Sequence, residues 1–313
     1  YVGSALVPVL QERGYDPKVI DSFWFGNHLP AGTPVLQKDL FDLTEADLKG
    51  FHQIVFLAGL SNDPMAEFSP SMNFISNAAG PAYLGYIAKR AGIRRFVFSG
   101  SCSVYGYTVD KLYDETSPAI SSYPYGISKL QGESSLLQMA DASFSVISLR
   151  KGTVSGYSPR MRLDLIVNTM FKTAVANGEI TVNNPAIWRP ILSIQDATAA
   201  YVRAIEAGEN ISGIFNVASG NYTVGEVADL VKERLEEKMN LRVKLKILDR
   251  QDYRNYKVSI EKAEKVLGFR PAHDIAGIVD SLAANVDKFR DVATPNYYNI
   301  EIFKKLVAPS STR

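Results

Sequence analysis

The sequence predicts an α/β protein built on a doubly wound parallel sheet, with a smaller C-terminal lobe. Short β-branched runs alternate with helical stretches through the first half of the chain. After about residue 150 this alternation loosens, and segments rich in Pro, Asn and Arg appear. The 313 residues suffice for one large domain or two closely joined ones. We therefore expect a Rossmann-type unit over 1–150 and a second lobe, mainly for substrate, over 151–313.

The first half supplies the sheet and its covering helices in alternation. Buried strands are predicted at residues 18–21, 53–58, 95–100 and 144–150. Helices are predicted between them, at residues 4–14, 44–50, 79–92 and 124–140. Gly14 and Gly92 suit helix C-caps, and Pro124 suits a first helical turn. Pro8 lies inside the first helix and is expected to kink it.

The second half carries two longer helical patterns, roughly 164–177 and 194–207. The chain opens at "YVGSALVPVL", already inside the first helix, without the strand and glycine turn that should precede it. We expect roughly ten further residues upstream, including a loop that cradles pyrophosphate. Gly3 would then be the third glycine of G-x-x-G-x-x-G, where a missing side chain allows the helix to pack closely on the sheet.

Composition excludes several classes of partner. The formal net charge is +1, from 34 basic and 33 acidic residues, so nucleic-acid binding has no electrostatic support. The three histidines are scattered without metal-site spacing, and the single cysteine, Cys102, excludes an intrachain disulfide. No apolar run reaches the roughly 18 residues that cross a bilayer, and no signal peptide is visible. We expect no metal, no membrane partner and, by default, a cytoplasmic location.

The stretch "SSYPYGISK" (121–129) contains a Tyr-x-x-x-Lys pair, Tyr125 and Lys129. The spacing alone is weak, because Tyr107/Lys111 and Tyr253/Lys257 repeat it in the same chain. The surroundings distinguish the first pair. Pro124 starts a helix beneath it, and Ser101 ends a strand motif 24 residues earlier. We interpret Tyr125 and Lys129 as functional and the Tyr107 pair as chance.

Ten motifs in order resemble the extended short-chain dehydrogenase/reductase family, in its nucleotide-sugar epimerase/dehydratase branch. The resemblance runs from Tyr1 to about residue 290. The motifs are "YVG", "VID", "FLAG", "NAAG", "SGSCSVYG", "YGISK", "LRKGTVSGYSPR", "WRPILSIQDATAA", "FNVASG" and "DYRNYKVSIEKAEKVLGF".

The resemblance implies NAD as cofactor. Asp21 ends the second strand 18 residues after Gly3, where its carboxylate would accept both adenosine ribose hydroxyls and repel a 2′-phosphate. Asp39 and Leu40 resemble adenine contacts, and the small-residue strand end at 57–59 would lie under the dinucleotide. The implied cofactor-binding residues are Gly3, Asp21, Asp39, Leu40, Leu57, Ala58, Gly59, Asn77, Ser99, Tyr125 and Lys129.

The catalytic residues implied are Ser101, Tyr125 and Lys129. Tyr125 would be the acid/base, with an ordinary phenol pKa near 10. Lys129, together with the oxidised nicotinamide, would lower that pKa by about two or three units, toward neutrality. Lys129 would also hydrogen-bond the nicotinamide ribose, and Ser101 the reacting hydroxyl.

The reaction type is indicated by "SCSVYG". Sugar 4,6-dehydratases of the branch carry Asp-Glu directly after the catalytic Ser/Thr, and the decarboxylases keep the Glu. Cys102 and Ser103 stand at those positions and supply no carboxylate. Cys102 also misses the position of the branch's proton-carrying cysteine, which Ser103 holds, and is interpreted as a buried filler. We therefore expect an NAD-dependent nucleotide-sugar 4-epimerase. A 4-ketoreductase or a non-catalytic dinucleotide sensor or scaffold are the alternatives.

The substrate implied is a nucleotide-diphosphate sugar. Arg189 and Arg254 match positions that grip the diphosphate, and an arginine fork suits phosphate oxygens. The implied substrate-binding residues are Ser101, Thr153, Asp164, Ile180, Val182, Arg189 and Arg254. Three residues depart from the branch: Thr153 replaces an Asn, Ser193 replaces a His, and Lys151 adds a charge near the nicotinamide end. Members commonly dimerise through two helices per subunit, so a homodimer is expected.

Overall fold

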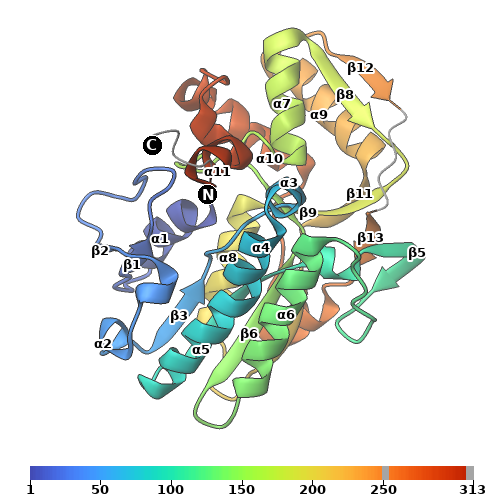
Figure 1. The fold of residues 1–313 in the computed structure, drawn as a ribbon. Coiled ribbons are helices and arrows are strands. Elements are labelled where there is room, and N and C mark those ends of the chain that lie inside the picture. The colour runs from blue at the N-terminus through green and yellow to red at the C-terminus, as the bar shows by residue number, and fades with distance from the viewer. Residues whose placement is uncertain (249–253, 308–313) are drawn as a thin grey trace.

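The computed structural model describes residues 1–248 and 254–307, and it is centred on a four-stranded parallel sheet (Figure 1). The strand order is β10-β6-β4-β3, and every neighbouring pair is parallel. The strands are β3 (Gln53–Phe56), β4 (Arg95–Ser101), β6 (Ser145–Lys151) and β10 (Gly213–Val217). The predicted α/β class with a parallel sheet is confirmed.

Helices cover both faces of this sheet. Helices α1 (Val2–Glu12) and α8 (Ile194–Glu206) pack on one face, and α5 (Gly80–Arg90) and α6 (Pro124–Met139) lie over the other (Figure 1). Side chains alternate along β4, so Val97 joins the first core while Phe96 and Phe98 join the second. Burial on both faces explains the continuous apolar run at 96–98.

A second lobe stands beyond the carboxyl ends of these strands, at the top of Figure 1. Its core is formed by α7 (Ile166–Asn177), α9 (Val224–Met239), α10 (Ile275–Ala283) and β8 (Glu179–Asn183), with β12 (Lys244–Leu248) paired to β8. Residues after 150 do not all belong to it, because α8 and β10 return to the first sheet.

Smaller elements connect the two parts. Strands β1 (Val19–Asp21) and β2 (Val35–Gln37) form a separate parallel pair. The remaining elements are η1 (Leu40–Asp42), α2 (Glu45–Leu48), α3 (Asp63–Phe68), α4 (Pro70–Phe74), η2 (Ile75–Ala79), η3 (Cys102–Tyr105), β5 (Tyr107–Tyr113), β7 (Thr153–Ser155), β9 (Trp188–Ser193), β11 (Gly220–Thr223), β13 (Asn255–Val258), η4 (Ala263–Leu267), η5 (Val286–Phe289), η6 (Pro295–Tyr297) and α11 (Asn299–Val307).

Several predicted helix boundaries and caps can be compared with the structure. Helix α1 continues through Pro8, and the predicted helix at 44–50 is a single turn, α2. Gly14 and Gly92 both have positive φ, as helix C-caps require. Helix α9 was not predicted, although Thr223 and Glu226 form a capping box at its start. Within the two described ranges, no helix is long and apolar enough to cross a membrane.

Arg95 joins the sheet to the end of α8, and its loss is expected to destabilise the fold. Its buried guanidinium donates to the carbonyls of Ala204, Ile205 and Ala207 at the end of α8, and to that of Gly208, which also accepts from the Ile211 N–H. Arg95→Met should lower the free energy of unfolding by about 2–3 kcal/mol, because it removes the donor that the carbonyls at the end of α8 share. Urea unfolding measures this loss. The exposed neighbour Arg94→Met should change it by no more than about 0.5 kcal/mol, and equal losses in the two variants would contradict the capping role.

Candidate active site

Ser101 lies at the carboxyl end of β4, where the strand turns into η3. Its hydroxyl oxygen accepts a hydrogen bond from the Ser103 backbone N–H at 3.2 Å, and the two serine hydroxyls lie 2.8 Å apart. Carboxyl ends of parallel strands form the ligand-binding edge of such sheets. Ser101 is therefore held at this edge, with its side chain only partly buried.

Tyr125 comes from the first turn of α6 and meets Ser101 across this edge. The Ser101 hydroxyl lies close enough to the Tyr125 phenol to lower the phenol's pKa. Burial raises the pKa more strongly, and nearby Asp63 adds to the increase. In the protein without dinucleotide, desolvation therefore outweighs the lowering effects of Ser101 and Arg162 on the Tyr125 pKa. The lowering expected beside Lys129 and a bound oxidised nicotinamide stays a prediction.

Lys129 lies one helical turn further along α6 and is buried. Its Nζ stands 5.3 Å from the centre of the Phe98 ring and 5.9 Å from the centre of the Tyr125 ring. Burial, and then the charge of Lys151, lower the pKa of Lys129 from 10.5 to about 7. This lysine therefore titrates in the neutral range.

The depressed pKa of Lys129 predicts a pH-dependent cost to stability. Between pH 7 and pH 10.5 the unfolded chain holds a proton on this lysine that the folded chain has lost, so stability rises with pH. Lys129→Met should therefore stabilise the dinucleotide-free protein by roughly 3–4 kcal/mol at pH 7, and by about half as much at pH 9. Urea unfolding at both pH values measures this gain, with the exposed Lys246→Met as control. A gain that is absent, or equal at both pH values, would show that Lys129 is not so perturbed.

Asn73 anchors the start of α6 and was missed by sequence reasoning. Its Nδ2 donates to the Pro124 carbonyl at 2.9 Å, and its Oδ1 accepts from Ser128 and Asn77. These bonds fix the first turn of α6, on which Tyr125 stands. The signal available in the sequence was weak, because Asn73 lies outside every motif of the resemblance.

The predicted dinucleotide groove brings small and polar residues to the end of β3. Ala58 and Gly59 are exposed there, and Gly59 has a φ of +110°. A Cβ at Gly59 would lie 2.2 Å from Asn77 Oδ1, so only glycine fits. Asn77 is fully buried, and its Oδ1 has no partner within the described part of the chain. A small-residue cradle beside an unsatisfied acceptor fits a bound dinucleotide.

Three residues predicted to contact adenosine lie in or after β1. Asp21 is exposed at the end of this strand, and its Oδ1 accepts from the Phe23 N–H at 2.6 Å. Asp39 caps η1 by accepting from the Phe41 N–H. Leu40 packs toward Gly80, where a Cβ would lie 2.5 Å from its Cδ2. These side chains border the groove, and their contacts to cofactor remain predictions.

Gly3 and Leu57 face each other between α1 and the end of β3. A Cβ at Gly3 would lie 3.6 Å from the Leu57 Cδ1, an ordinary van der Waals distance. Packing against Leu57 does not by itself require glycine, and the predicted close packing of Gly3 on the sheet stays a prediction. Its role beside a dinucleotide remains a prediction. Ser99 lies two residues before Ser101 on β4 and is buried.

Arg189 and Arg254 lie beside each other near the start of α6. Arg254 pairs with Asp63 at 2.6 Å and lies 5.9 Å from the centre of the Tyr123 ring, while Arg189 donates to the Arg254 carbonyl. Asp63 Oδ1 is buried without a partner among the described residues. Asp63 was not predicted, yet it links α3 to the arginine side of the cleft.

Asp164 forms an ion pair with Arg162, two residues earlier in the chain. Its carboxylate receives two hydrogen bonds from Arg162, at 2.9 and 3.0 Å, and one from Asn62 at 3.2 Å. Arg162 also lowers the pKa of Tyr125, which places this ion pair near the site. A contact between Asp164 and a diphosphate would set two anions against each other, so we expect Arg162 to mediate it.

Ile180 and Val182 were predicted to bind substrate, and the structure contradicts this. Both side chains are at most 2% exposed and join the core of the second lobe. Alternation along β8 places Thr181 and Asn183 on the exposed face instead. The apolar pattern identified the buried face of the strand, which is the face that a ligand cannot reach.

Four other residues discussed in the sequence are placed as follows: Cys102, Thr153 and Ser193 in the family motifs, and Tyr107 in the second Tyr-x-x-x-Lys pair. Cys102 is fully buried and donates through Sγ to the Arg150 carbonyl at 3.1 Å, as a small filler should. Thr153 is partly buried on β7, and Ser193 caps α8. Tyr107 is half exposed on β5. Tyr253 lies outside the described residues.

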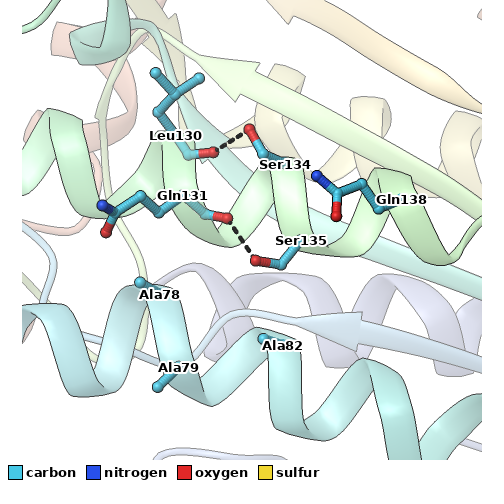
Figure 2. A pocket seen from close by; sticks show the side chains of 8 residues that line it. All are labelled: Ala78, Ala79, Ala82, Leu130, Gln131, Ser134, Ser135 and Gln138. Carbon is cyan, nitrogen blue, oxygen red and sulfur yellow. Dashed lines mark hydrogen bonds between the residues drawn. The ribbon is translucent and has the colours of Figure 1, made fainter.

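A shallow groove is lined by none of the predicted site residues. Figure 2 shows it between two walls. One wall is the end of η2 and the start of α5, and the other is α6. Alanine, leucine, serine and glutamine line it, without a charged side chain. The lining residues are Ala78, Ala79, Ala82, Leu130, Gln131, Ser134, Ser135 and Gln138.

A doubly wound sheet with Ser101, Tyr125 and Lys129 at its carboxyl edge defines a dinucleotide-dependent short-chain dehydrogenase/reductase. The model of the NAD dependent epimerase/dehydratase family matches residues 1–218. The chain belongs to the NAD dependent epimerase/dehydratase family, and it is an enzyme whose cofactor is NAD. The predicted family resemblance and the predicted cofactor are confirmed.

Relatives with different reactions match this chain at similar identity. UDP-glucose 4-epimerase of Corynebacterium glutamicum is 28% identical over 301 residues, covering 90% of this chain and 91% of that protein. UDP-glucuronic acid decarboxylase 4 of Arabidopsis thaliana is 26% identical over 291 residues, covering 87% of this chain and 63% of that protein. These identities show that the proteins are related, but they do not distinguish between epimerisation and decarboxylation as the reaction of this chain.

Solved structures share the fold. UDP-glucose 4-epimerase of Thermotoga maritima with UDP-glucose superimposes with a TM-score of 0.81 at 22% identity, covering 94% of this chain and 96% of that one. An NAD-dependent NDP-hexosamine 5,6-dehydratase of tunicamycin biosynthesis gives a TM-score of 0.79 at 21% identity, covering 90% and 93%. The architecture is therefore common to epimerases and dehydratases.

Proposed function

We propose that the protein is an NAD-dependent nucleotide-sugar 4-epimerase that acts by transient oxidation to a 4-keto sugar. One observation carries this proposal. The Ser101 hydroxyl and the Tyr125 phenol lie close together at the carboxyl edge of the sheet, and the Lys129 Nζ lies 5.9 Å from the centre of the Tyr125 ring, while Cys102 and Ser103 supply no carboxylate. Oxidation and reduction at one carbinol carbon need this set of groups, whereas dehydration needs a further acid/base pair.

Each residue has a distinct task in the proposed cycle. When bound, NAD would supply the acceptor for hydride from the sugar carbon and the donor for its return. Tyr125 removes the C4 hydroxyl proton and later donates it back, and Ser101 orients that hydroxyl. Lys129 holds the nicotinamide ribose and stabilises the phenolate. The keto sugar must present its opposite face before it is reduced, so the pocket must allow the sugar to turn.

The arginine side of the cleft supports a diphosphate-bearing substrate. Arg254 and Arg189 lie next to each other, and Arg162 stands near Tyr125. Guanidinium groups bind phosphate oxygens through paired hydrogen bonds. UDP sugars are the substrates named for the epimerase relatives, so we take a UDP sugar as the first substrate to test.

Cofactor retention and product analysis test the proposed reaction. An epimerase should purify with NAD bound and interconvert C4 epimers without net cofactor consumption, as measured by chromatography of the sugar nucleotides. Thermal shift with UDP-, dTDP-, GDP- and CDP-sugars should identify the substrate class, since a ligand at a hundredfold excess over Kd stabilises by about 2.7 kcal/mol. Stoichiometric loss of reduced cofactor would instead identify a 4-ketoreductase.

We propose further that the protein is a homodimer joined through the groove between α5 and α6. The groove is uncharged and is lined by small and amide side chains on two neighbouring helices (Figure 2), which suits helix packing between copies. Ala79→Arg should therefore convert a dimer into a monomer in sedimentation velocity. A dimer unaffected by this change would place the interface elsewhere.

A further inference from the structure

Lys151 ends β6 at the same edge of the sheet as the proposed catalytic residues. It is the direct strand partner of Ser101 on β4, and its Nζ donates a hydrogen bond to the Ser99 hydroxyl. The Nζ also lies 5.7 Å from the centre of the Tyr201 ring. This ring belongs to α8, and its buried hydroxyl has no partner within the described ranges. Lys151 is thus held by neutral groups.

The charge of Lys151 acts on the site without a counter-ion of its own. Lys151 forms no salt bridge with a carboxylate of the described residues. It reaches the site from β6, whereas Lys129 reaches it from α6, and its charge opposes protonation of Lys129. Two lysine side chains therefore approach the carboxyl edge of the sheet from different elements, close enough for the charge of Lys151 to affect Lys129. The proposed chemistry requires only one of them.

We propose that Lys151 sets the redox preference of the cofactor site, by favouring the reduced form of the dinucleotide over the oxidised form. This inference rests on the proposed function, which places the nicotinamide beside Ser101, Tyr125 and Lys129. The oxidised nicotinamide ring carries a positive charge and the reduced ring is neutral. An ammonium fixed nearby therefore repels the first and leaves the second almost unaffected.

The preference has a consequence for the proposed cycle. Weaker binding of the oxidised form relative to the reduced form favours the state in which the sugar is a 4-keto intermediate. Two like charges several Å apart in a partly buried site repel each other by about the free energy that changes an equilibrium constant tenfold. The site should therefore bind the reduced dinucleotide about tenfold better, relative to the oxidised one, than it would without this charge. The hydrogen bond to Ser99 and the contact with Tyr201 would keep the charge in place.

Equilibrium binding of the two dinucleotides tests this inference without any turnover. Protein freed of dinucleotide is titrated with NADH by fluorescence, and NAD⁺ is measured by competition. The measured quantity is the ratio of the NAD⁺ Kd to the NADH Kd. In Lys151→Met this ratio should fall about tenfold, whereas Lys151→Arg, which keeps the charge, should stay close to wild type.

Lys262→Met is the matched control. Lys262 also contacts an aromatic ring, with its Nζ 4.8 Å from the centre of Phe215, but it lies beside Gly213, where β10 begins, at the opposite end of the sheet. A ratio in Lys151→Met within twofold of wild type would overturn the proposal, as would an equal fall in Lys151→Arg. If Lys151→Met does not fold, Lys151→Gln is measured in its place. Wild-type protein that binds neither dinucleotide would instead contradict the proposed active site itself.

Discussion

Tyr125→Phe is expected to lower kcat for the proposed epimerisation by about 10²–10⁴-fold, while dinucleotide binding stays near wild type. The substitution removes one oxygen, the atom that exchanges a proton with the sugar, and leaves the ring beside Lys129. The measurement is single-turnover epimerisation together with NADH fluorescence titration.

The matched control is Tyr107→Phe, because Tyr107 and Lys111 share the spacing of Tyr125 and Lys129. Tyr107 is half exposed on β5 and should tolerate the change with full activity. Wild-type turnover in Tyr125→Phe would assign the proton transfer to another group. Loss of dinucleotide binding in Tyr125→Phe would show that the substitution disturbs the binding site, so that the loss of activity could not be assigned to proton transfer.

Arg150→Met is expected to lower the free energy of unfolding by about 3–5 kcal/mol. Arg150 on β6 and Glu133 on α6 form a buried ion pair at 2.5 Å, with side chains 4% and 2% exposed. Glu133 also accepts from the Ser148 hydroxyl at 2.7 Å, and Arg150 donates to the Tyr105 hydroxyl at 2.9 Å. Removing only the arginine leaves a carboxylate inside the protein without its cation.

The double variant Glu133→Met/Arg150→Met distinguishes this effect from simple loss of packing. Replacing both charges removes the unpaired carboxylate, so the double variant should be more stable than Arg150→Met alone. The exposed pair Arg290 and Asp287 serves as control, and Arg290→Met should change stability by no more than about 0.5 kcal/mol. A double variant less stable than the single one would show that packing, not charge, dominates. Urea unfolding measures all four proteins.

This ion pair also bears on the site, because Glu133 follows Lys129 by one turn of α6. The pair joins α6 to β6, the strand that ends in Lys151. Loss of the pair would therefore loosen the two elements that bring the lysines together. We expect Arg150→Met to weaken activity through position, without a change in the pH at which activity is half-maximal.

How far the sequence predicted the site depends on the kind of residue. Ser101, Tyr125 and Lys129 were found because they lie within recognisable motifs at fixed spacing. Asn73 and Asp63 were missed, since their contacts join segments distant in sequence. Ile180 and Val182 were misassigned for a related reason. An apolar alternation reveals which face of a strand is buried but not which face meets a ligand.

The sequence by itself determined the parallel sheet, the order of its helices, the family and the serine–tyrosine–lysine set, because periodicity and motif spacing are local properties of the chain. Only the tertiary structure decided the charges around that set. Burial raises the pKa of Tyr125, while burial and Lys151 lower that of Lys129. Protonation depends on desolvation and on neighbours brought in from other elements, and both exist only after the chain has folded.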